Sequence, residues 1–454
     1  MKVKILIASM LLIVITNYKG ACRPQKISDK SLHKGNNTSP GLHQSDLRPV
    51  NNMDMTVTLT RGEVPLNGPW AFKLGNDERW AQSQFDDRSW ERVDFTPAPG
   101  AHDGDVGLPG YVPGWAARGH AGRWGHAWYR LHVRWSTTGG ARLVLIGPTL
   151  VDAAYEIYWN GRRMGGIGGF GVAPPCIYGV HPQLFRLGET SSAGEGVFAI
   201  HVYLPKELAG DPEGGGIHVA PILAEPAAGS ALLLAQWWRT FWGYVVDLVE
   251  PLALLALALF MLSLRRFWAG DRFLLFTAAA VCAIAASRVN QPLFYWSGVE
   301  SLHTLIIARY VILNPLAIVL WVIACNRMAG RADRRADTAA WVSGVLAGSA
   351  AFPGIDAQLL QTIARLALLA LYCWSAFCAT RVAPLRPLAL LTMLVMAVAL
   401  FAAEFSAIGV PGIWFPFGVG VSRTQYALAF AIPLLAVLAH LRTSPAGSAI
   451  KPKK

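Results

Sequence analysis

The chain has 454 residues and a net charge of +12, and 53% of its residues are hydrophobic while only 15% are charged. This composition excludes a single soluble globule, and the length leaves room for two or three domains. The positive charge lies largely in short loops between apolar segments and forms no basic motif interleaved with aromatic residues, so we expect no nucleic-acid partner.

Residues 1–21 are typical of a secretory signal peptide. Two lysines precede an apolar run at 5–15 that is too short to cross a bilayer. Cleavage would leave Cys22 at the new N-terminus, so lipidation of this residue stays open as an alternative. The segment at 22–55 is polar and contains clustered Asn, Ser, Pro and Gly, and we expect a flexible linker there.

The region at 56–225 has the period-two hydrophobicity of β-strands. In the predicted strand at 128–135, apolar side chains alternate with polar ones. The polar ones are Arg130, His132 and Arg134, which we expect on a wet face opposite a buried one. Further strands are predicted at 142–146, 154–159 and 197–204. An Asn-Gly pair follows the second of these, as in a two-residue hairpin turn, and an antiparallel sandwich is expected.

Four short motifs in this region occur together in one known family. They are LNGPWAF at 66–72, FDDRSW at 85–90, WYR at 128–130 and YEIYWNGR at 155–162. With them, roughly residues 60–222 are similar to the galactose-binding-like jelly-roll domain that accompanies β-galactosidases and other family-two glycoside hydrolases. The resemblance mainly implies a fold, in which the aromatic motif residues belong to the core. These residues are Trp70, Phe72, Trp90 and Trp159.

The sequence lacks the parts with which those hydrolases catalyse. They use two carboxylates on a separate barrel, for which this sequence has no counterpart. It also has no G-x-S-x-G, H-E-x-x-H or phosphate-loop (G-x-x-x-x-G-K-S/T) motif, and its histidines do not fall at metal-ligand spacing. We therefore expect no enzyme, no cofactor and no metal site.

If the β-rich region binds a ligand, the long Gly-rich loop at 97–127 is the first place to look. Aromatic faces stack on sugar rings, while Arg and His donate hydrogen bonds to hydroxyls or carboxylates. The candidate ligand-binding residues are Tyr111, Trp115, Arg118, His120, Arg123, Trp124 and His126. An ordered loop whose tryptophans pack on the sandwich is the alternative, and both interpretations stay open.

Beyond residue 225 the chain changes to apolar segments that suit a bilayer. We expect a juxtamembrane segment at 226–241, a helical bundle at 242–442 and a short cytoplasmic tail at 443–454. Seven spans are predicted at 242–264, 273–289, 304–326, 339–353, 358–380, 387–408 and 425–441. The predicted fold class is thus an all-β jelly-roll sandwich, galactose-binding-like, followed by an all-α seven-helix transmembrane bundle, with membrane lipid as a partner.

Loop charge sets the predicted orientation. The inner loops and the tail carry thirteen basic residues, against two in the outer loops, Arg288 and Arg423. The inner ones are Arg265, Arg266, Arg272, Arg327, Arg331, Arg334, Arg335, Arg381, Arg386, Arg442, Lys451, Lys453 and Lys454. This positive-inside bias predicts a protein of the bacterial inner (cytoplasmic) membrane, with its N-terminal domain in the periplasm and its C-terminus in the cytoplasm.

Charged residues inside spans are costly and mark a bundle interior or a pathway. The predicted intramembrane cluster is Asp247, Glu250, Arg309, Arg365 and Glu404. Under the predicted orientation all five lie in the outer part of the membrane, where opposite charges can pair. A structural ion-pair network and a ligand or ion site are both open interpretations.

An exported sugar-binding-like domain before seven helices resembles the bacterial seven-transmembrane receptors with diverse intracellular signalling modules. In that family the last helix usually leads into an enzymatic output domain, but only residues 443–454 follow here. The resemblance implies a non-enzymatic receptor that binds an extracytoplasmic ligand, which is a carbohydrate or another envelope component. The receptor would relay the binding signal to a separate cytoplasmic signalling protein. A membrane-embedded transporter or enzyme using the charged cluster, or an envelope docking protein, is the alternative.

Overall fold

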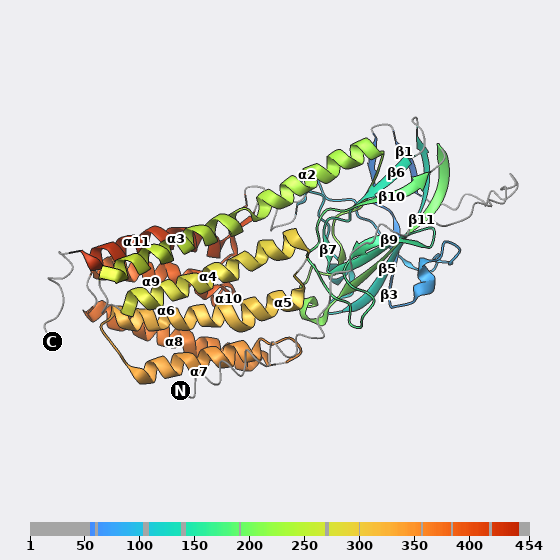
Figure 1. Cartoon of the computed structure of the whole chain (residues 1–454). Helices are drawn as coiled ribbons and strands as arrows, with labels where there is room; N and C mark the ends of the chain where they lie inside the picture. The colour runs from blue at the N-terminus through green and yellow to red at the C-terminus, as the bar shows by residue number, and fades with distance from the viewer. Residues whose placement is uncertain are drawn as a thin grey trace, which may run out of the picture.

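The computed structural model describes residues 55–59, 62–102, 109–137, 142–189, 192–267, 272–298, 300–355, 357–382, 385–416 and 420–444. The predicted signal peptide, all but the last residue of the predicted linker and all but the first two residues of the predicted tail lie outside them. In the described residues, β-sheets form the N-terminal half and helices the C-terminal half, at opposite ends of an elongated molecule (Figure 1).

Two sheets make up most of the β-rich half. The larger has seven strands in the order β4-β3-β5-β11-β8-β9, with β1 parallel to β5. Its strands are β1 (Met55–Leu59), β3 (Trp70–Leu74), β4 (Glu91–Val93), β5 (Gly125–Thr137), β8 (Ala154–Trp159), β9 (Arg162–Ile167) and β11 (Ala193–Leu204). The smaller sheet has the order β10-β6-β13-β2. Its strands are β2 (Glu63–Pro65), β6 (Arg142–Ile146), β10 (Leu184–Glu189) and β13 (Ile222–Ala224).

The remaining short elements lie between these strands. They are the β7–β12 pair (Val151–Asp152 and Gly216–Ile217) and the 3₁₀ turns η3 (Glu78–Ala81), η4 (Ala116–Arg118) and η5 (Lys206–Leu208). The strands predicted at 142–146, 154–159 and 197–204 coincide with β6, β8 and the second half of β11, so period-two hydrophobicity located them correctly.

Both sheets contribute to one hydrophobic core. Leu131, Ile157 and Ile200 of the larger sheet and Leu145 and Leu223 of the smaller sheet are all 0–1% exposed and belong to the same cluster. The aromatic motif residues also pack inside the β-rich half: Trp70 and Phe72 in this core, Trp90 in a second cluster and Trp159, half-buried, beside Phe198. Burial of these rings is a major source of stability for the half.

The face of β5 that we expected to be wet is covered at Arg130, whereas His132 and Arg134 on the same face are partly exposed. Arg130 lies on that face and is 0% exposed, because the segment at 78–90 folds over it. Its Nε donates to Asp87 Oδ2 (2.7 Å), and its Nη1 donates to the Gln82 carbonyl oxygen (2.9 Å). His132 Nε2 lies 3.0 Å from the same carboxylate oxygen. The alternation along β5 was predicted correctly, but the covering layer comes from another part of the sequence.

Helices form the rest of the described chain. They are α2 (Pro226–Tyr244), α3 (Val246–Phe267), α4 (Arg272–Ser297), α5 (Leu302–Ile306), the π-helix η6 (Ile307–Leu313), α6 (Asn314–Met328), α7 (Arg334–Ala350), α8 (Gln358–Val382), α9 (Arg386–Leu400), α10 (Ala402–Ala407) and α11 (Arg423–Thr443). A short β14–β15 hairpin (Ile413–Pro416 and Gly420–Ser422) precedes α11. The predicted juxtamembrane segment at 226–241 lies within the helix α2.

Five helices in the described residues are long and apolar enough to cross a membrane, where the sequence predicted seven spans. They are Pro226–Leu264, Arg272–Ser297, Leu302–Met328, Gln358–Arg381 and Arg423–Thr443. The predicted span at 387–408 is interrupted after Leu400, which leaves the shorter apolar helix α9. The predicted span at 339–353 falls in α7, which has 17 residues. Arg288, which we placed in an outer loop, lies within α4.

The two halves touch at the ends of α4 and α5 (Figure 1). The Leu302 backbone N–H donates to the Ile177 carbonyl oxygen (2.9 Å), and Tyr178 and Ser301 form an isolated β-bridge. Gly179 lies against the backbone of Phe294 so closely that a β-carbon would come within 2.3 Å of its carbonyl oxygen. The β-rich half thus rests directly on the start of the third long helix.

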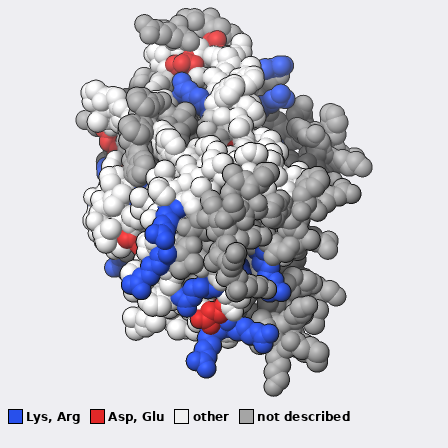
Figure 2. Space-filling model, turned by 90° about the vertical axis from the view of Figure 1, so that its left-hand side faces the viewer, with Lys and Arg blue, Asp and Glu red and all other residues white. Residues whose placement is uncertain are grey.

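Basic side chains gather at the opposite end of the helices, away from the β-rich half. Figure 2 looks onto this end, where Lys and Arg stand out among the described residues. Arg334, Arg335, Arg381, Arg386 and Arg442 all lie at helix ends there. Arg442 Nη1 donates to the Met328 carbonyl oxygen at 3.4 Å, which ties the last helix to the end of α6.

Candidate functional site

The seven candidate residues of the Gly-rich loop do not converge on one site. Trp115 is 1% exposed and belongs to the core, whereas Trp124 is 55% exposed. The Trp115 indole N–H donates to the Arg123 carbonyl oxygen (3.2 Å). Arg118 donates to the backbone carbonyls of Pro113 within the loop and of Asp94 just after β4, which ties the loop to the sheet edge. Of the loop at 97–127, residues 103–108 lie outside the described part of the chain.

Two further candidates, Tyr111 and His126, contact separate partners. The Tyr111 ring stacks on His218 with centroids 5.2 Å apart, and its hydroxyl donates to Glu213 Oε2 (3.2 Å). His126 Nδ1 lies 2.9 Å from His201 Nε2, in a hydrogen-bonded imidazole pair. Burial lowers the pKa of His201 to about 3, helped by the neighbouring His126, and burial lowers the pKa of His126 as well.

One of the seven, His120, lines a small pocket at the edge of the larger sheet. Its Nε2 lies 2.8 Å from Glu91 Oε2. The pocket has a volume of about 250 Å³ and is lined by Phe72, Lys73, Leu74, Ser89, Trp90, Glu91 and His120. Lys73 Nζ lies 5.0 Å from the centre of the Trp80 ring, as in a cation–π contact. The sequence analysis missed Glu91 and Lys73, because both come from strands and not from the loop.

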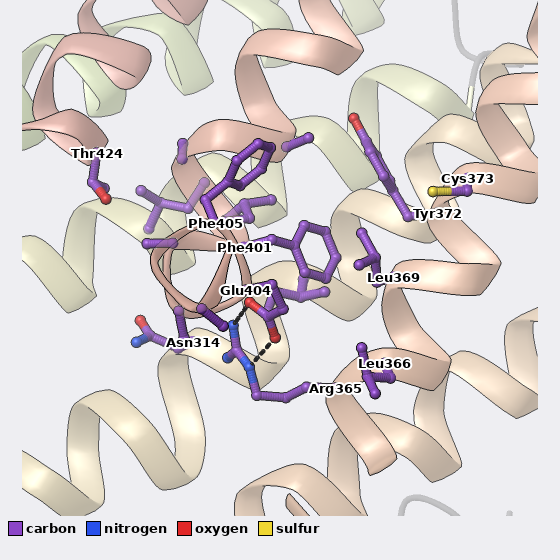
Figure 3. Close-up of a pocket in the computed structure, with 18 of the residues that line it drawn as sticks. Asn314, Arg365, Leu366, Leu369, Tyr372, Cys373, Phe401, Glu404, Phe405 and Thr424 are labelled. Atoms are coloured by element: carbon purple, nitrogen blue, oxygen red, sulfur yellow. Dashed lines mark hydrogen bonds and ion pairs between the residues drawn. The ribbon is translucent and has the colours of Figure 1, made fainter. Parts of the chain in front are cut away.

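A much larger cavity lies within the helical half. Its volume is about 1090 Å³, and its walls come from α4, η6, α6, α8, α9, α10 and α11. Most lining side chains are apolar, but Arg365 of α8 and Glu404 of α10 point toward one another at its centre (Figure 3). Arg365 Nε and Nη2 donate to the two carboxylate oxygens at 2.6 and 2.7 Å, so the ion pair is bidentate.

The other predicted intramembrane charges divide into two groups. Asp247 and Glu250 of α3 both pair with Arg288 of α4, which donates from Nε to Glu250 Oε2 at 3.0 Å. The Gln425 side-chain amide donates to Asp247 Oδ1 (3.0 Å) and joins α11 to this group. Arg309 stands apart and donates from Nη1 to the neutral Gln291 amide oxygen (2.9 Å). The structure therefore brings four of the five predicted residues into ion pairs and adds Arg288, which the sequence analysis missed.

Two irregular backbone segments position the charges of the cavity. Arg309 and Tyr310 lie in the π-helix η6, whose wider turn shifts the side chains that follow relative to an α-helix. Glu404 lies in α10, beyond a break at Phe401, where φ is −106° and ψ is 40°. Irregular backbone at membrane depth is tolerated where it lines a cavity, and such helix breaks often mark binding sites.

No protein-family model matches the chain, and no curated protein is significantly similar to it. Among solved structures, a β-glucuronidase of Bacteroides uniformis matches at 19% identity over 36% of this chain and 17% of that chain, with a TM-score of 0.25. A β-glucuronidase from glycoside hydrolase family 2 matches at 19% identity over 36% and 17% of the two chains, with a TM-score of 0.26. A β-glycosidase from Bacteroides vulgatus matches at 20% identity over 36% and 20%, with a TM-score of 0.25.

This chain therefore spans a fifth or less of the length of those enzymes. At these TM-scores the matches assign it neither an activity nor a ligand. Among the described residues, function can be argued from a small pocket with charged and aromatic lining in the β-rich half and from a large, mainly apolar cavity with charged groups in the helical half.

Proposed function

We propose that the chain is a non-enzymatic receptor of the bacterial cytoplasmic membrane. In this proposal the two sheets form a jelly-roll sandwich outside the membrane, and α7 and the α9–α10 pair complete a bundle of seven spans with the five long helices. The basic helix ends then face the cytoplasm, in accord with the positive-inside rule. A separate cytoplasmic protein reads the packing of the bundle.

The direct contact between the β-rich half and the third long helix carries this proposal. Ile177 and Tyr178 meet Ser301 and Leu302 through the backbone, and η6 begins five residues after Leu302. A movement of the β-rich half would therefore press on the segment that holds Arg309 at the cavity wall. A receptor needs such a mechanical link between its ligand-binding part and a bundle with two alternative packings.

The pocket beside His120 is the proposed ligand site of the β-rich half. Glu91 can accept hydrogen bonds from hydroxyl groups, and His120 and Ser89 can donate or accept them. The 250 Å³ of this pocket is below the range of about 300–1,000 Å³ typical of drug-sized ligands, so a single sugar ring is the appropriate size. The motif resemblance to sugar-binding jelly rolls supports a carbohydrate ligand.

Titration of the full-length protein in lipid nanodiscs tests both parts of this proposal. Monosaccharides, uronic acids and cell-wall fragments serve as probes, with hydrogen exchange as the readout. We expect at least one probe to bind more tightly than millimolar, and to change amide exchange at 302–313 as well as in the β-rich half. Glu91→Ala should weaken that binding about tenfold or more, because a charged hydrogen-bond acceptor is lost.

Glu78→Ala is the matched control, because Glu78 is exposed and outside the pocket, and it should bind as the wild type does. Binding no tighter than millimolar for every probe, or an unchanged affinity in Glu91→Ala, would contradict the carbohydrate site. Exchange changes confined to the β-rich half would contradict the relay.

The large cavity makes a transporter the second candidate, which uptake of a probe into proteoliposomes would favour.

A further inference from the structure

One arginine of the helical cavity has no acidic partner. Three arginines line this cavity, namely Arg288, Arg309 and Arg365. Arg288 is paired with two carboxylates and Arg365 with one, in bidentate geometry. Arg309 forms no ion pair with any described residue, and its buried Nε has no hydrogen-bond partner among them. Asp247 is close enough to attract Arg309 electrostatically but is itself paired with Arg288, so the Arg309 guanidinium keeps donor capacity that an anion can use.

The rest of the cavity is suited to a hydrocarbon chain. Its walls between α8 and α9 consist of apolar side chains, among them Leu369, Met393 and Ala397. Leu366, Leu394 and Ile408 also line it and are exposed, so the cavity opens sideways between helices, where lipid would lie. The volume of about 1090 Å³ is larger than a charged headgroup alone requires.

We propose that this cavity binds an amphipathic anion, with a single carboxylate or phosphate head on Arg309 and an acyl chain along the apolar wall between α8 and α9. The guanidinium of Arg309 lines the cavity and is planar, so its N–H donors have the fixed geometry that carboxylate and phosphate oxygens accept. The tail enters through the sideways opening and covers the exposed leucines. This inference concerns the helical half alone and does not depend on the sugar site.

The location of Arg309 gives the ligand a means of acting on the protein. Arg309 lies in η6, a π-helix directly continuous with α5, whose first residue is bonded to the β-rich half. An anion bound to Arg309 would interact more favourably with one packing arrangement of η6 than with others. It would therefore stabilise that arrangement. The acyl ligand and the β-rich half therefore act on the same element from its two ends.

Native mass spectrometry of the full chain, released from a neutral maltoside detergent, tests the proposal with three twelve-carbon probes. The probes are dodecanoate, dodecyl phosphate and the neutral dodecanol. We expect one equivalent of either anion to bind at least about tenfold more tightly than dodecanol, since only the anions can pair with the arginine. Arg309→Gln should lower the affinity for both anions at least about tenfold, and Arg309→Lys should restore only part of it, because lysine keeps the charge but not the planar pair of donors.

Two further variants separate the site from general effects on the fold. Arg334→Gln removes an exposed arginine at the other end of the helices and should leave binding unchanged. Leu366→Trp places a bulky ring at the sideways opening and should weaken binding of the anions while Arg309 is intact. Equal binding of dodecanol and dodecanoate, no binding by the wild type, or wild-type affinity in Arg309→Gln would each overturn the proposal.

The same spectra identify the source of the anion. A phospholipid that co-purifies with the wild type and with Arg309→Lys but not with Arg309→Gln supports a bilayer lipid as the natural occupant. A wild type without co-purified lipid that still binds dodecanoate supports a free acid. Co-purified lipid that is retained equally by Arg309→Gln contradicts a headgroup on Arg309.

Discussion

Single buried polar groups influence the stability of the β-rich half and its dependence on pH. Asp87 is the clearest case, because it joins Arg130 and His132 beneath the segment at 78–90. Burial raises the pKa of Asp87, but the hydrogen bonds from His132 and Arg130 outweigh it and leave the pKa below its usual value. The sequence motif at 85–90 contains Asp87 but could not reveal these partners, which are more than forty residues away in the chain.

His201 should make the β-rich half sensitive to acid. Its pKa is lowered to about 3 when folded and is near 6.5 when unfolded, so the unfolded chain binds a proton that the folded chain does not. The stability that neutral His201 provides is therefore complete above pH 6.5 and is lost as the pH falls below it, by about 1.4 kcal/mol per unit. We expect the unfolding midpoint of the full chain to fall between pH 7 and pH 5.

His201→Phe keeps an aromatic ring on Trp128, which lies 4.3 Å away between ring centres, and removes the titrating group. Its unfolding midpoint should depend less steeply on pH than that of the wild type. His440→Gln, which changes an exposed histidine in α11, should keep the wild-type slope. An unchanged slope in His201→Phe would show that another group causes the acid sensitivity.

At the scale of elements, the β-rich half meets the helices along α2, which packs on β6, and at a close approach of Gly179 to α4. Gly179 lies where a β-carbon would be 2.3 Å from the Phe294 carbonyl oxygen, and backbone atoms on both sides leave little room to move. Leu302 and Ile177 hold the neighbouring backbone at 2.9 Å. The strand segment and the helix ends are therefore packed as one unit.

Gly179→Ala should loosen this contact without altering the pocket beside His120 or the helical cavity. Overpacking of this kind typically costs about 1–3 kcal/mol, so we expect a lower thermal midpoint and faster amide exchange at 302–313. Gly171→Ala is the control, because a β-carbon added there would meet nothing within 4 Å, and it should behave as the wild type. Unchanged exchange at 302–313 in Gly179→Ala would mean that the two halves are not coupled at this point.

The long, regular elements could be predicted from the sequence, whereas most of the short strands and the irregular segments could not. Alternating hydrophobicity located β6, β8 and β11, and hydropathy located the five long helices, because both signals are local and repeat over many residues. The break at Phe401 and the π-helix η6 carry no comparable signal, since long-range packing imposes them. For the same reason Arg288 was assigned to a loop, although it is the centre of an ion-pair group.

For the whole molecule, the orientation in the membrane is the prediction on which the receptor proposal depends. The basic helix ends lie opposite the β-rich half, so the positive-inside rule predicts that the C-terminus stays in the cytoplasm. Alkaline phosphatase fused behind Lys454 should be inactive, and a green fluorescent protein fused there should fluoresce.

Alkaline phosphatase joined directly after Glu225, in place of the helices, should be active, because the β-rich half is expected outside the membrane. This fusion is the positive control for export. Active phosphatase behind Lys454 would place both ends of the chain on the same side and would reverse the proposed direction of signalling.

The helix formed by α2 and α3 has a mechanical consequence. It runs for 39 residues from Pro226 to Leu264, and Val245 at the junction keeps helical dihedral angles of −63° and −33°. A rod of that length measures about 58 Å, roughly twice the thickness of a bilayer's hydrocarbon core of about 30 Å. Its outer part, α2, would extend beyond the lipid and pack beside the sheets. A tilt of the β-rich half would therefore be transmitted through α2 to α3, where it would displace Asp247 and Glu250.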